Sequence, residues 1–324
     1  MNPTSTIFEI IQPELQRVDE VLAEAAKTDH WLLGVALSHL LPGKGKRIRP
    51  SLALLAGKFH NFDDEKIVTI AAAVEMLHTA SLVHDDVVDG AEERRGAPTL
   101  FTRVGNAVAV LAGDYLFAKS AAYAASTNNL EVIARFADTV MTMCQGQIDE
   151  ANRAPDVHLS LTRESYFRTI YSKTASLFVL ACESGAILSG APQSTVDALR
   201  DYGRDLGLAF QVIDDILDFV GDEQVLGKPV GSDLRHGVVT LPLIYLREEV
   251  PLATFRAAFE SDDHGEDVVA RVLDLLHQSN AIERSYEEAR RLATRAMEHL
   301  DGLPSNGPHE ALRELARYVV ERTW

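Results

Sequence analysis

The chain has 324 residues, 46% of them hydrophobic, and a formal net charge of -17. This apolar fraction supports a sizeable core and excludes a disordered chain, while the acidic balance argues against nucleic-acid binding. The two cysteines, Cys144 and Cys182, are too few for a disulfide framework, and we interpret them as buried free thiols. Because we find neither a signal-peptide pattern nor about 18 uninterrupted apolar residues, we expect a cytoplasmic protein without a membrane-spanning helix.

Helical periodicity dominates the chain. Apolar residues recur at three- and four-residue steps through 67–81 and 130–144, as in core-facing helices. Further helices are predicted near 8–26, 107–126, 163–189, 195–220, 265–278, 281–301 and 308–322. Alternating strand patterns, long linkers and repeats are missing from the sequence. We therefore predict an all-α protein in which residues 1–324 form one bundle domain.

Two acidic clusters interrupt these apolar helices. They share the spacing D-D-x-x-D and consist of Asp85, Asp86 and Asp89, then Asp214, Asp215 and Asp218. A helical turn of about 100° per residue places the three carboxylates of each cluster on one face. Mg²⁺ prefers carboxylate oxygens and completes its coordination with water and substrate phosphates. The alternative is a pair of solvated acidic turns, but the repetition of the spacing in two apolar helices favours a magnesium and diphosphate site.

Basic residues stand near both acidic clusters. They are Lys44, Lys46, Arg47 and Arg49 in GKGKRIRP, Arg94 and Arg95 in EERRG, Lys173 and Lys228. Such groups are the usual phosphate ligands, although each one alone would be interpreted as a solvated surface cation. Together they suggest two phosphorylated ligands, one held through Mg²⁺ and one held directly. His78 could also bind a phosphate, while the Glu75-x-x-His78 pair is only half of a di-iron signature.

With these motifs in place, the chain resembles the trans-isoprenyl (polyprenyl) diphosphate synthase family over nearly its whole length. The resemblance is carried by GKGKRIRP, HTASLVHDDVVDGAEERRG, GDYLFA, YSKTASLF and AFQVIDDILDFVGDEQVLGKPVGSDL followed by TLP, in the family's order. It implies packed helices around a deep central cavity, usually in a homodimer. It also implies Mg²⁺-dependent head-to-tail condensation of isopentenyl diphosphate with an allylic diphosphate, and at most transient membrane contact.

The resemblance further implies a role for each motif residue. Three Mg²⁺ ions on the allylic diphosphate would be held by Asp85, Asp86, Asp89 and Asp214, with Asp215 and Asp218 nearby. The allylic diphosphate would also be held by Arg94, Lys173 and Lys228. The isopentenyl diphosphate would be held by Lys46, Arg49, His78 and Arg95. Thr174 and Gln211 would place oxygen dipoles near the developing allylic cation, and the released diphosphate would take the final proton.

One position departs from the family pattern. The family often has lysine after the second acidic motif where this chain has Val238. This leaves open a non-catalytic subunit of a heteromeric synthase. A terpene cyclase or head-to-head condensing enzyme is a further alternative, but it would have less use for a second set of diphosphate-binding cations.

Two small residues before the first acidic cluster bear on product length. Ser81 lies four residues before Asp85, nearly in line with it on the helix, and Ala80 is its neighbour. An aromatic side chain at either position would block a tail growing away from the acids. We therefore predict a product longer than geranylgeranyl diphosphate. The alternatives are a farnesyl or geranylgeranyl diphosphate synthase, in which Ala80 and Ser81 merely permit close helix packing.

Overall fold

The computed structural model describes residues 9–41, 46–94, 96–151, 162–221, 230–259 and 266–322. The chain divides into two compact units. The first comprises Met1–Met141, Leu177–Gly203 and Met297–Leu315, and the second comprises Thr142–Ser176, Arg204–Ala296 and Ala316–Trp324. The position of one unit relative to the other is not determined. The single domain over 1–324 and a deep cavity shared by the two acidic clusters therefore stay predictions.

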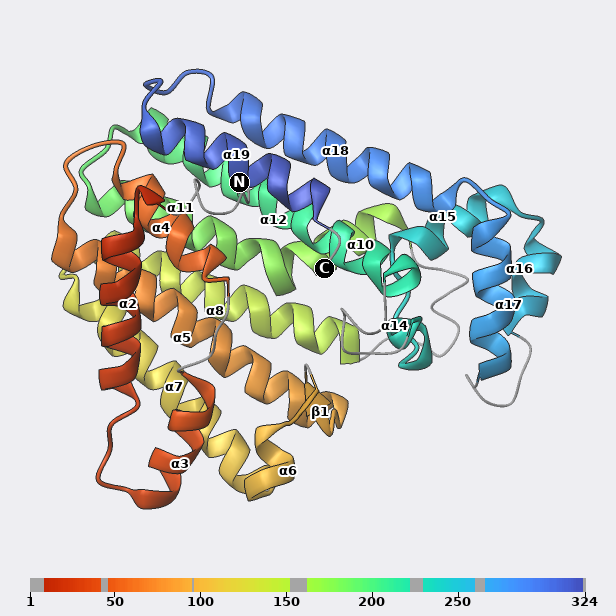
Figure 1. Ribbon diagram of the computed structural model, residues 1–324, viewed down its shortest axis with the longest axis horizontal. Helices are drawn as coiled ribbons and strands as arrows, with labels where there is room; N and C mark the ends of the chain where they lie inside the picture. Colours follow the sequence, from red (N-terminus) through yellow and green to blue (C-terminus); the bar gives the residue numbers. More distant parts are fainter. Residues whose placement is uncertain are drawn as a thin grey trace. The chain divides into compact units, whose positions relative to one another are not determined.

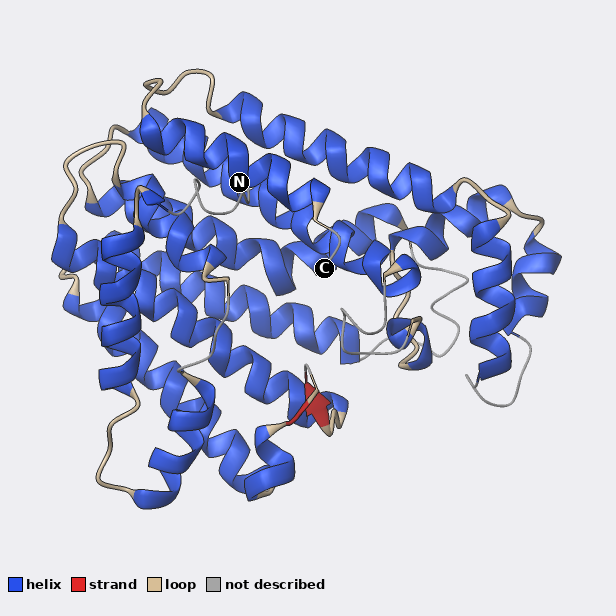
Figure 2. Ribbon diagram, viewed as in Figure 1, coloured by secondary structure: helices blue, strands red, loops and turns tan. Residues whose placement is uncertain are grey.

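Helices make up nearly all of the described chain, which confirms the all-α class (Figures 1 and 2). In chain order they are α2 (Gln12–Ala25), α3 (Trp31–Leu40), α4 (Ile48–Gly57), α5 (Asp64–Asp89), α6 (Leu100–Val104), α7 (Asn106–Ser126), α8 (Leu130–Ala151), α10 (Arg163–Ile170), the π-helix η1 (Tyr171–Ala175), α11 (Ser176–Leu188), α12 (Gln193–Val220), α14 (Ser232–Arg235), α15 (Leu241–Glu249), α16 (Leu252–Phe259), α17 (Glu266–His277), α18 (Ala281–His299) and α19 (Gly307–Glu321). A short antiparallel hairpin of β1 (Glu93–Arg94) and β2 (Ala97–Pro98), absent from the sequence prediction, follows α5.

Helix α5 is the central helix of the first unit. It begins where the Asp63 side chain accepts a hydrogen bond from the Lys66 N–H at 3.2 Å, and it ends at Gly90, whose φ of 63° is left-handed. It packs against α2, α4 and α7, and it runs beside α7 in Figure 1. Among the described helices, α5 alone is long and apolar enough to cross a membrane by length and composition. Because 67% of its most apolar window is buried inside the protein, we interpret it as a core helix.

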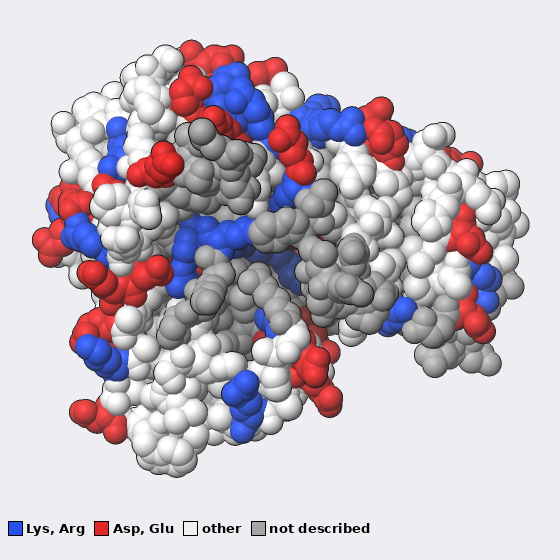
Figure 3. Space-filling model, in the orientation of Figure 1, with Lys and Arg blue, Asp and Glu red and all other residues white. Residues whose placement is uncertain are grey.

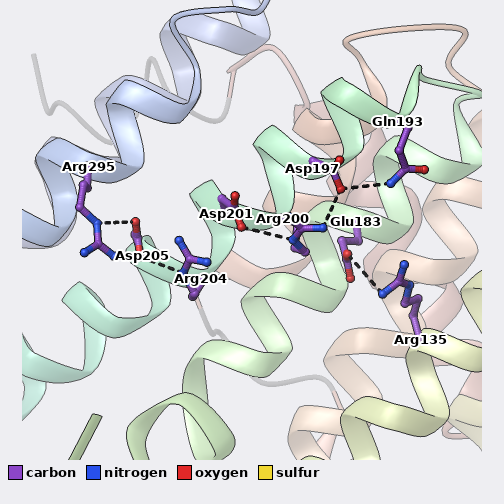
Figure 4. A network of polar contacts seen from close by, with 9 residues as sticks. All are labelled: Arg135, Glu183, Gln193, Asp197, Arg200, Asp201, Arg204, Asp205 and Arg295. Carbon is purple, nitrogen blue, oxygen red and sulfur yellow. Dashed lines mark hydrogen bonds and ion pairs between the residues drawn. The ribbon is translucent and has the colours of Figure 1, made fainter. Parts of the chain in front are cut away.

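Ion pairs link helices within each unit (Figure 4). In the first unit, Arg135 of α8 lies 3.8 Å from Glu183 of α11, whereas Arg200 and Asp197 pair at 2.6 Å within α12 itself. In the second unit, Asp205 is fully buried and accepts hydrogen bonds from Arg295, at 2.5 and 2.9 Å. Buried carboxylates are costly unless paired, so Arg295 of α18 is a required partner of Asp205 on α12.

Two further features are the distribution of charged side chains on the surface and the exposure of the two cysteines. Around the rim of the face drawn in Figure 3, acidic and basic side chains lie in small mixed groups. Cys182 is buried in α11, as predicted, and burial raises the pKa of its thiol. The prediction was wrong for Cys144, which is exposed on α8 because it lies on the face of that helix that also exposes Met141 and Ile148.

Candidate active site

The first acidic cluster forms the last turn of α5. Asp85 is half-buried, Asp86 is buried and Asp89 is exposed. The carbonyl end of a helix carries partial negative charge, and the last turn of α5 contains no basic residue. Three carboxylates at this end therefore create a local negative potential that attracts cations.

One cation of the protein already meets this cluster. Arg94, on strand β1 just beyond α5, donates from Nε to Asp86 Oδ1 at 2.7 Å. Burial raises the pKa of the Asp86 carboxyl, and the Arg94 guanidinium opposes that rise. Asp86 therefore has a partner within the chain, whereas Asp89 presents its carboxylate to solvent. Arg95, predicted beside it, lies outside the described residues.

The histidine before the cluster fixes α5 against α7. The ring of His84 donates from Nε2 to the Val110 carbonyl at 3.1 Å and lies 3.5 Å from Asp114. Gly113 makes room for it, because a Cβ at that position would overlap the imidazole. The first two residues of the GDYLFA motif, Gly113 and Asp114, therefore have a structural role: they fix the position of His84, which directly precedes Asp85.

The basic set of the first unit lies at the start of α4 and on α5. Lys46, Arg49 and His78 are all half-buried. The Arg49 guanidinium lies 5.1 Å above the Phe178 ring, a cation–π geometry that restrains it. Helices α4 and α5 pack together, so the two basic segments belong to one neighbourhood of the unit.

In the second unit, the second cluster lies on α12 beside the π-helix η1. The Thr174 hydroxyl donates to Gln211 Oε1 at 2.7 Å, and Gln211 Nε2 donates to Asp215 Oδ1 at 2.8 Å. Tyr166 on α10 donates its hydroxyl to Asp215 Oδ2 at 2.6 Å. The predicted Thr174, Gln211 and Asp215 are thus joined in one hydrogen-bond chain. Single π-turns are common at functional sites, and here the π-turn carries both Lys173 and Thr174.

The three aspartates of the second cluster have different environments. Burial raises the pKa of Asp215 well above its usual range, and the nearby Asp233 adds to the rise. Asp218 is buried and accepts the Asp233 N–H at 3.0 Å, which anchors the first turn of α14. Asp214 is the exposed member, with 41% of its side chain accessible, and it pairs with Arg322 at 2.7 Å.

Some site residues have partners that sequence reasoning missed. Lys173 forms an ion pair with Glu150 of α8, and Arg322 and Tyr166 were not singled out either. Tyr166 and Arg322 belong to no acidic or basic run, so no local signal marked them. Lys228 lies outside the described residues, and Val238 is half-buried with its N–H bonded to the Asp233 carbonyl at 2.8 Å.

The donor chemistry of both clusters suits a hard divalent cation. Exposed or half-buried carboxylates at Asp85, Asp89 and Asp214 are the oxygen ligands that Mg²⁺ and Ca²⁺ prefer. Across the described ranges, however, no three His, Cys, Asp or Glu side chains are already gathered closely enough to hold a metal. The ion pairs of Asp86 and Asp214 keep those carboxylates engaged with arginine instead.

Comparison with known proteins agrees with this donor set. The "Heptaprenyl diphosphate synthase component 2" of Geobacillus stearothermophilus is 40% identical over 319 residues, covering 98% of each chain. A polyprenyl synthase from Caulobacter crescentus CB15, solved with calcium and isoprenyl diphosphate, superposes with a TM-score of 0.92 at 33% identity, over 99% of this chain and 98% of that one. A decaprenyl diphosphate synthase from Rhodobacter capsulatus gives a TM-score of 0.91 at 34% identity, over 99% of both chains.

The family assignment follows from a match over most of the chain. The family model described as "Polyprenyl synthetase" matches residues 30–276, a range that contains both acidic clusters. The helical fold and the paired D-D-x-x-D motifs agree with it. The chain belongs to the polyprenyl synthetase family and is a prenyltransferase of isoprenoid biosynthesis.

Proposed function

We propose that this prenyltransferase condenses isopentenyl diphosphate head-to-tail with an allylic diphosphate and makes a polyprenyl diphosphate longer than geranylgeranyl diphosphate. The observation that carries the chemistry is the acidic last turn of α5, where three carboxylates stand at the negative end of a helix. The chain length is supported by two relatives whose names specify heptaprenyl and decaprenyl products. It is also supported by Ala80, a small, fully buried residue on α5.

In the proposed reaction the carbon–oxygen bond of the allylic diphosphate breaks and the double bond of isopentenyl diphosphate attacks the allylic carbon. Mg²⁺, with three ions as the expected number, would neutralise the departing diphosphate when bound at Asp85, Asp89 and Asp214. Arg94 and Lys173 supply fixed positive charge for the same group, together with the predicted Lys228. The released inorganic diphosphate would take the proton lost as the new allylic double bond forms.

The remaining residues bind and orient the substrates. Lys46, Arg49 and His78, with the predicted Arg95, would hold isopentenyl diphosphate directly. The hydrogen bond from Thr174 to Gln211 orients both side chains beside Asp215. Oxygen dipoles held in this way stabilise a developing allylic cation without reorganising during the reaction.

The test is incubation with farnesyl diphosphate, labelled isopentenyl diphosphate and Mg²⁺, followed by chromatography of the products. We expect label in chains longer than geranylgeranyl diphosphate, and no incorporation by the Asp85→Ala control. Products that stop at geranylgeranyl diphosphate would make this a shorter-chain synthase. Turnover only in the presence of a second, different subunit would make it one component of a heteromeric enzyme.

We also propose that the protein is a homodimer in the cytoplasm, with at most transient membrane contact. Large apolar side chains are exposed on α7 and α8, where Leu111 is 66% and Leu130 84% accessible. On α8 the exposed apolar positions continue at helical spacing after Leu130, through Ala134, Ala137 and Met141. Exposed apolar faces of this kind mark protein interfaces, and a second copy of the chain is the proposed occupant.

Light scattering on the purified protein tests the assembly. We expect twice the chain mass of 35.6 kDa, and a monomer for Met141→Glu. A wild-type monomer would contradict the dimer. Membrane flotation with neutral vesicles tests the location, and stable co-flotation without product would contradict the cytoplasmic assignment.

A further inference from the structure

We propose that Arg47 and Glu75 are positioning residues that hold the start of α4 in the conformation that binds isopentenyl diphosphate. Neither residue is among those assigned to substrate above. The inference rests on the proposed function, because it concerns how Lys46, Arg49 and His78 are arranged for their ligand.

The Arg47 side chain points into the protein and is almost fully engaged. Only 14% of it is accessible. Its guanidinium pairs with Glu75 Oε1 at 2.8 Å, with Asp19 Oδ1 at 2.9 Å, and it donates to the Leu41 carbonyl at 3.2 Å. The arginine in the middle of a basic run therefore serves the fold, although the sequence placed it with the phosphate ligands.

The backbone of Arg47 needs such an anchor. Its φ of 50° and ψ of 35° are left-handed, and only one other non-glycine residue of the described ranges, Asn128, has a positive φ. This conformation is disfavoured for a residue with a Cβ, because the Cβ approaches the carbonyl oxygen that follows it. At the same position the carbonyl accepts the Ser51 N–H at 3.0 Å and the Ser51 hydroxyl at 2.7 Å, which begins α4. The side-chain contacts therefore stabilise a turn that the backbone alone disfavours.

This turn determines where the neighbouring cations stand. Lys46 directly precedes it, and Arg49 lies in the first turn of α4. Glu75 lies on α5, one helical turn before His78, and 11% of its side chain is accessible. The Arg47–Glu75 pair thus joins the two segments that supply the proposed isopentenyl diphosphate ligands. It also gives the Glu75-x-x-His78 pair a role that requires no iron.

The experiment measures isopentenyl diphosphate binding by calorimetry, without allylic substrate, for Glu75→Gln and Arg47→Lys. Glu75→Gln keeps the size of the side chain but removes its charge, and Arg47→Lys keeps the charge but loses the guanidinium that contacts Glu75, Asp19 and Leu41 together. We expect the dissociation constant and the KM for isopentenyl diphosphate to rise about tenfold, because small displacements of binding groups are costly. The KM for the allylic substrate and kcat should stay within about twofold. The double variant should bind no more weakly than the weaker single variant, since the two residues act as one unit.

A matched control exists at the other end of the same helix. Lys58 pairs with Glu14 at 2.5 Å, and 20% and 14% of their side chains are accessible. Lys58→Met should therefore lower the thermal midpoint to a similar extent as Glu75→Gln while leaving isopentenyl diphosphate binding unchanged. Circular dichroism at the assay temperature checks that every variant is folded.

Three outcomes separate the inference from the function on which it rests. Wild-type binding by folded Glu75→Gln and Arg47→Lys, together with weak binding by Lys46→Ala, would overturn the positioning role alone. Unchanged binding by Lys46→Ala would instead reject the proposed isopentenyl diphosphate site. Equal loss of binding in Lys58→Met and Glu75→Gln would show a general stability effect and would also overturn the positioning role.

Discussion

Arg322, just beyond α19, is buried and forms an ion pair with the more accessible Asp214, the first aspartate of the second acidic cluster. Its guanidinium lies 2.7 Å from Asp214 Oδ1, stacks 3.9 Å above the Phe210 ring and donates to the Phe210 carbonyl at 2.7 Å. Only 5% of the Arg322 side chain is accessible. The carboxylate proposed to bind magnesium is therefore also a structural partner of the C-terminal helix.

This pair predicts that two aspartates with the same proposed role differ in their effect on stability. Asp214→Asn should abolish turnover and lower the free energy of unfolding by about 1 kcal/mol, because it leaves the buried Arg322 with a neutral partner. Asp89→Asn should abolish turnover as well, but its unfolding free energy should stay within about 0.5 kcal/mol of the wild type, since it removes an exposed charge at a helix carbonyl end. Urea unfolding without metal measures both values. Equal destabilisation by the two variants would contradict the structural role of Asp214.

A second prediction concerns the packing of the His84 imidazole against Gly113. Gly113→Ala should place a Cβ against the imidazole, which must then leave the Val110 carbonyl. Overpacking of this kind costs about 1–3 kcal/mol, and we expect kcat to fall because Asp85 follows His84 directly.

The matched control is Gly302→Ala, whose new methyl group would meet no atom within 4 Å. It should leave both the unfolding free energy and kcat unchanged. If Gly113→Ala is as active and as stable as this control, the imidazole has an alternative position and the GDYLFA motif needs another explanation.

Much of the fold was predictable because helical periodicity is a local property. The predicted helices at 107–126, 195–220 and 281–301 match α7, α12 and α18 within two residues at each end. The helices α3 and α15 were missed because they are short, and short segments offer few positions in which a helical period can be detected. The π-turn of η1 has no known spacing signal, so the predicted helix over 163–189 gave no hint of it.

The site was predictable residue by residue, but its internal pairing was not. The spacing D-D-x-x-D identifies acids that share a helix face, yet it treats the three positions as equal. Tertiary contacts make them different: Asp215 is buried under Tyr166, whereas Asp214 faces Arg322. Those partners lie far along the chain from the cluster. Only the folded chain brings them together.

A third prediction tests the length of the product. Ala80 is fully buried on α5, five residues before Asp85, so Ala80→Phe should fill space along the proposed path of the growing tail. We expect shorter products with kcat for the first condensation largely kept, as measured by chromatography. The added ring should also cost about 1–3 kcal/mol of stability, so unfolding must be followed in parallel.

The control for this substitution is Ala257→Phe, which adds the same ring at an exposed position of α16. It should leave product length as in the wild type. Unchanged product length in folded Ala80→Phe would reject α5 as the determinant of length and point to another helix.

The last prediction concerns two buried glutamates with opposite dependence on pH. Glu183 is 3% exposed, and within the described chain its Oε1 has no hydrogen-bond partner, with Arg135 3.8 Å away. Burial raises the pKa of Glu183 above the usual 4.5, despite the nearby arginines. A raised folded-state pKa contributes stability that is present below 4.5 and is lost as the pH rises through the folded value. Glu183→Gln should therefore be more stable than the wild type at pH 8, by about 1 kcal/mol, and equal to it at pH 4.

Glu288 is the matched case of opposite sign. It accepts two hydrogen bonds from Arg291, at 2.6 and 2.9 Å, and these lower the pKa of its carboxyl. A lowered folded-state pKa contributes stability that is present above the usual 4.5 and is lost as the pH falls through the folded value. Glu288→Gln should thus be less stable than the wild type at pH 8, with the difference vanishing in acid. Urea unfolding of the wild type and both variants between pH 4 and pH 8 measures how each difference in unfolding free energy depends on pH. If the difference in unfolding free energy between variant and wild type changed with pH in the same direction for both glutamates, the pairing with Arg135, and not burial, would determine the folded-state pKa of Glu183.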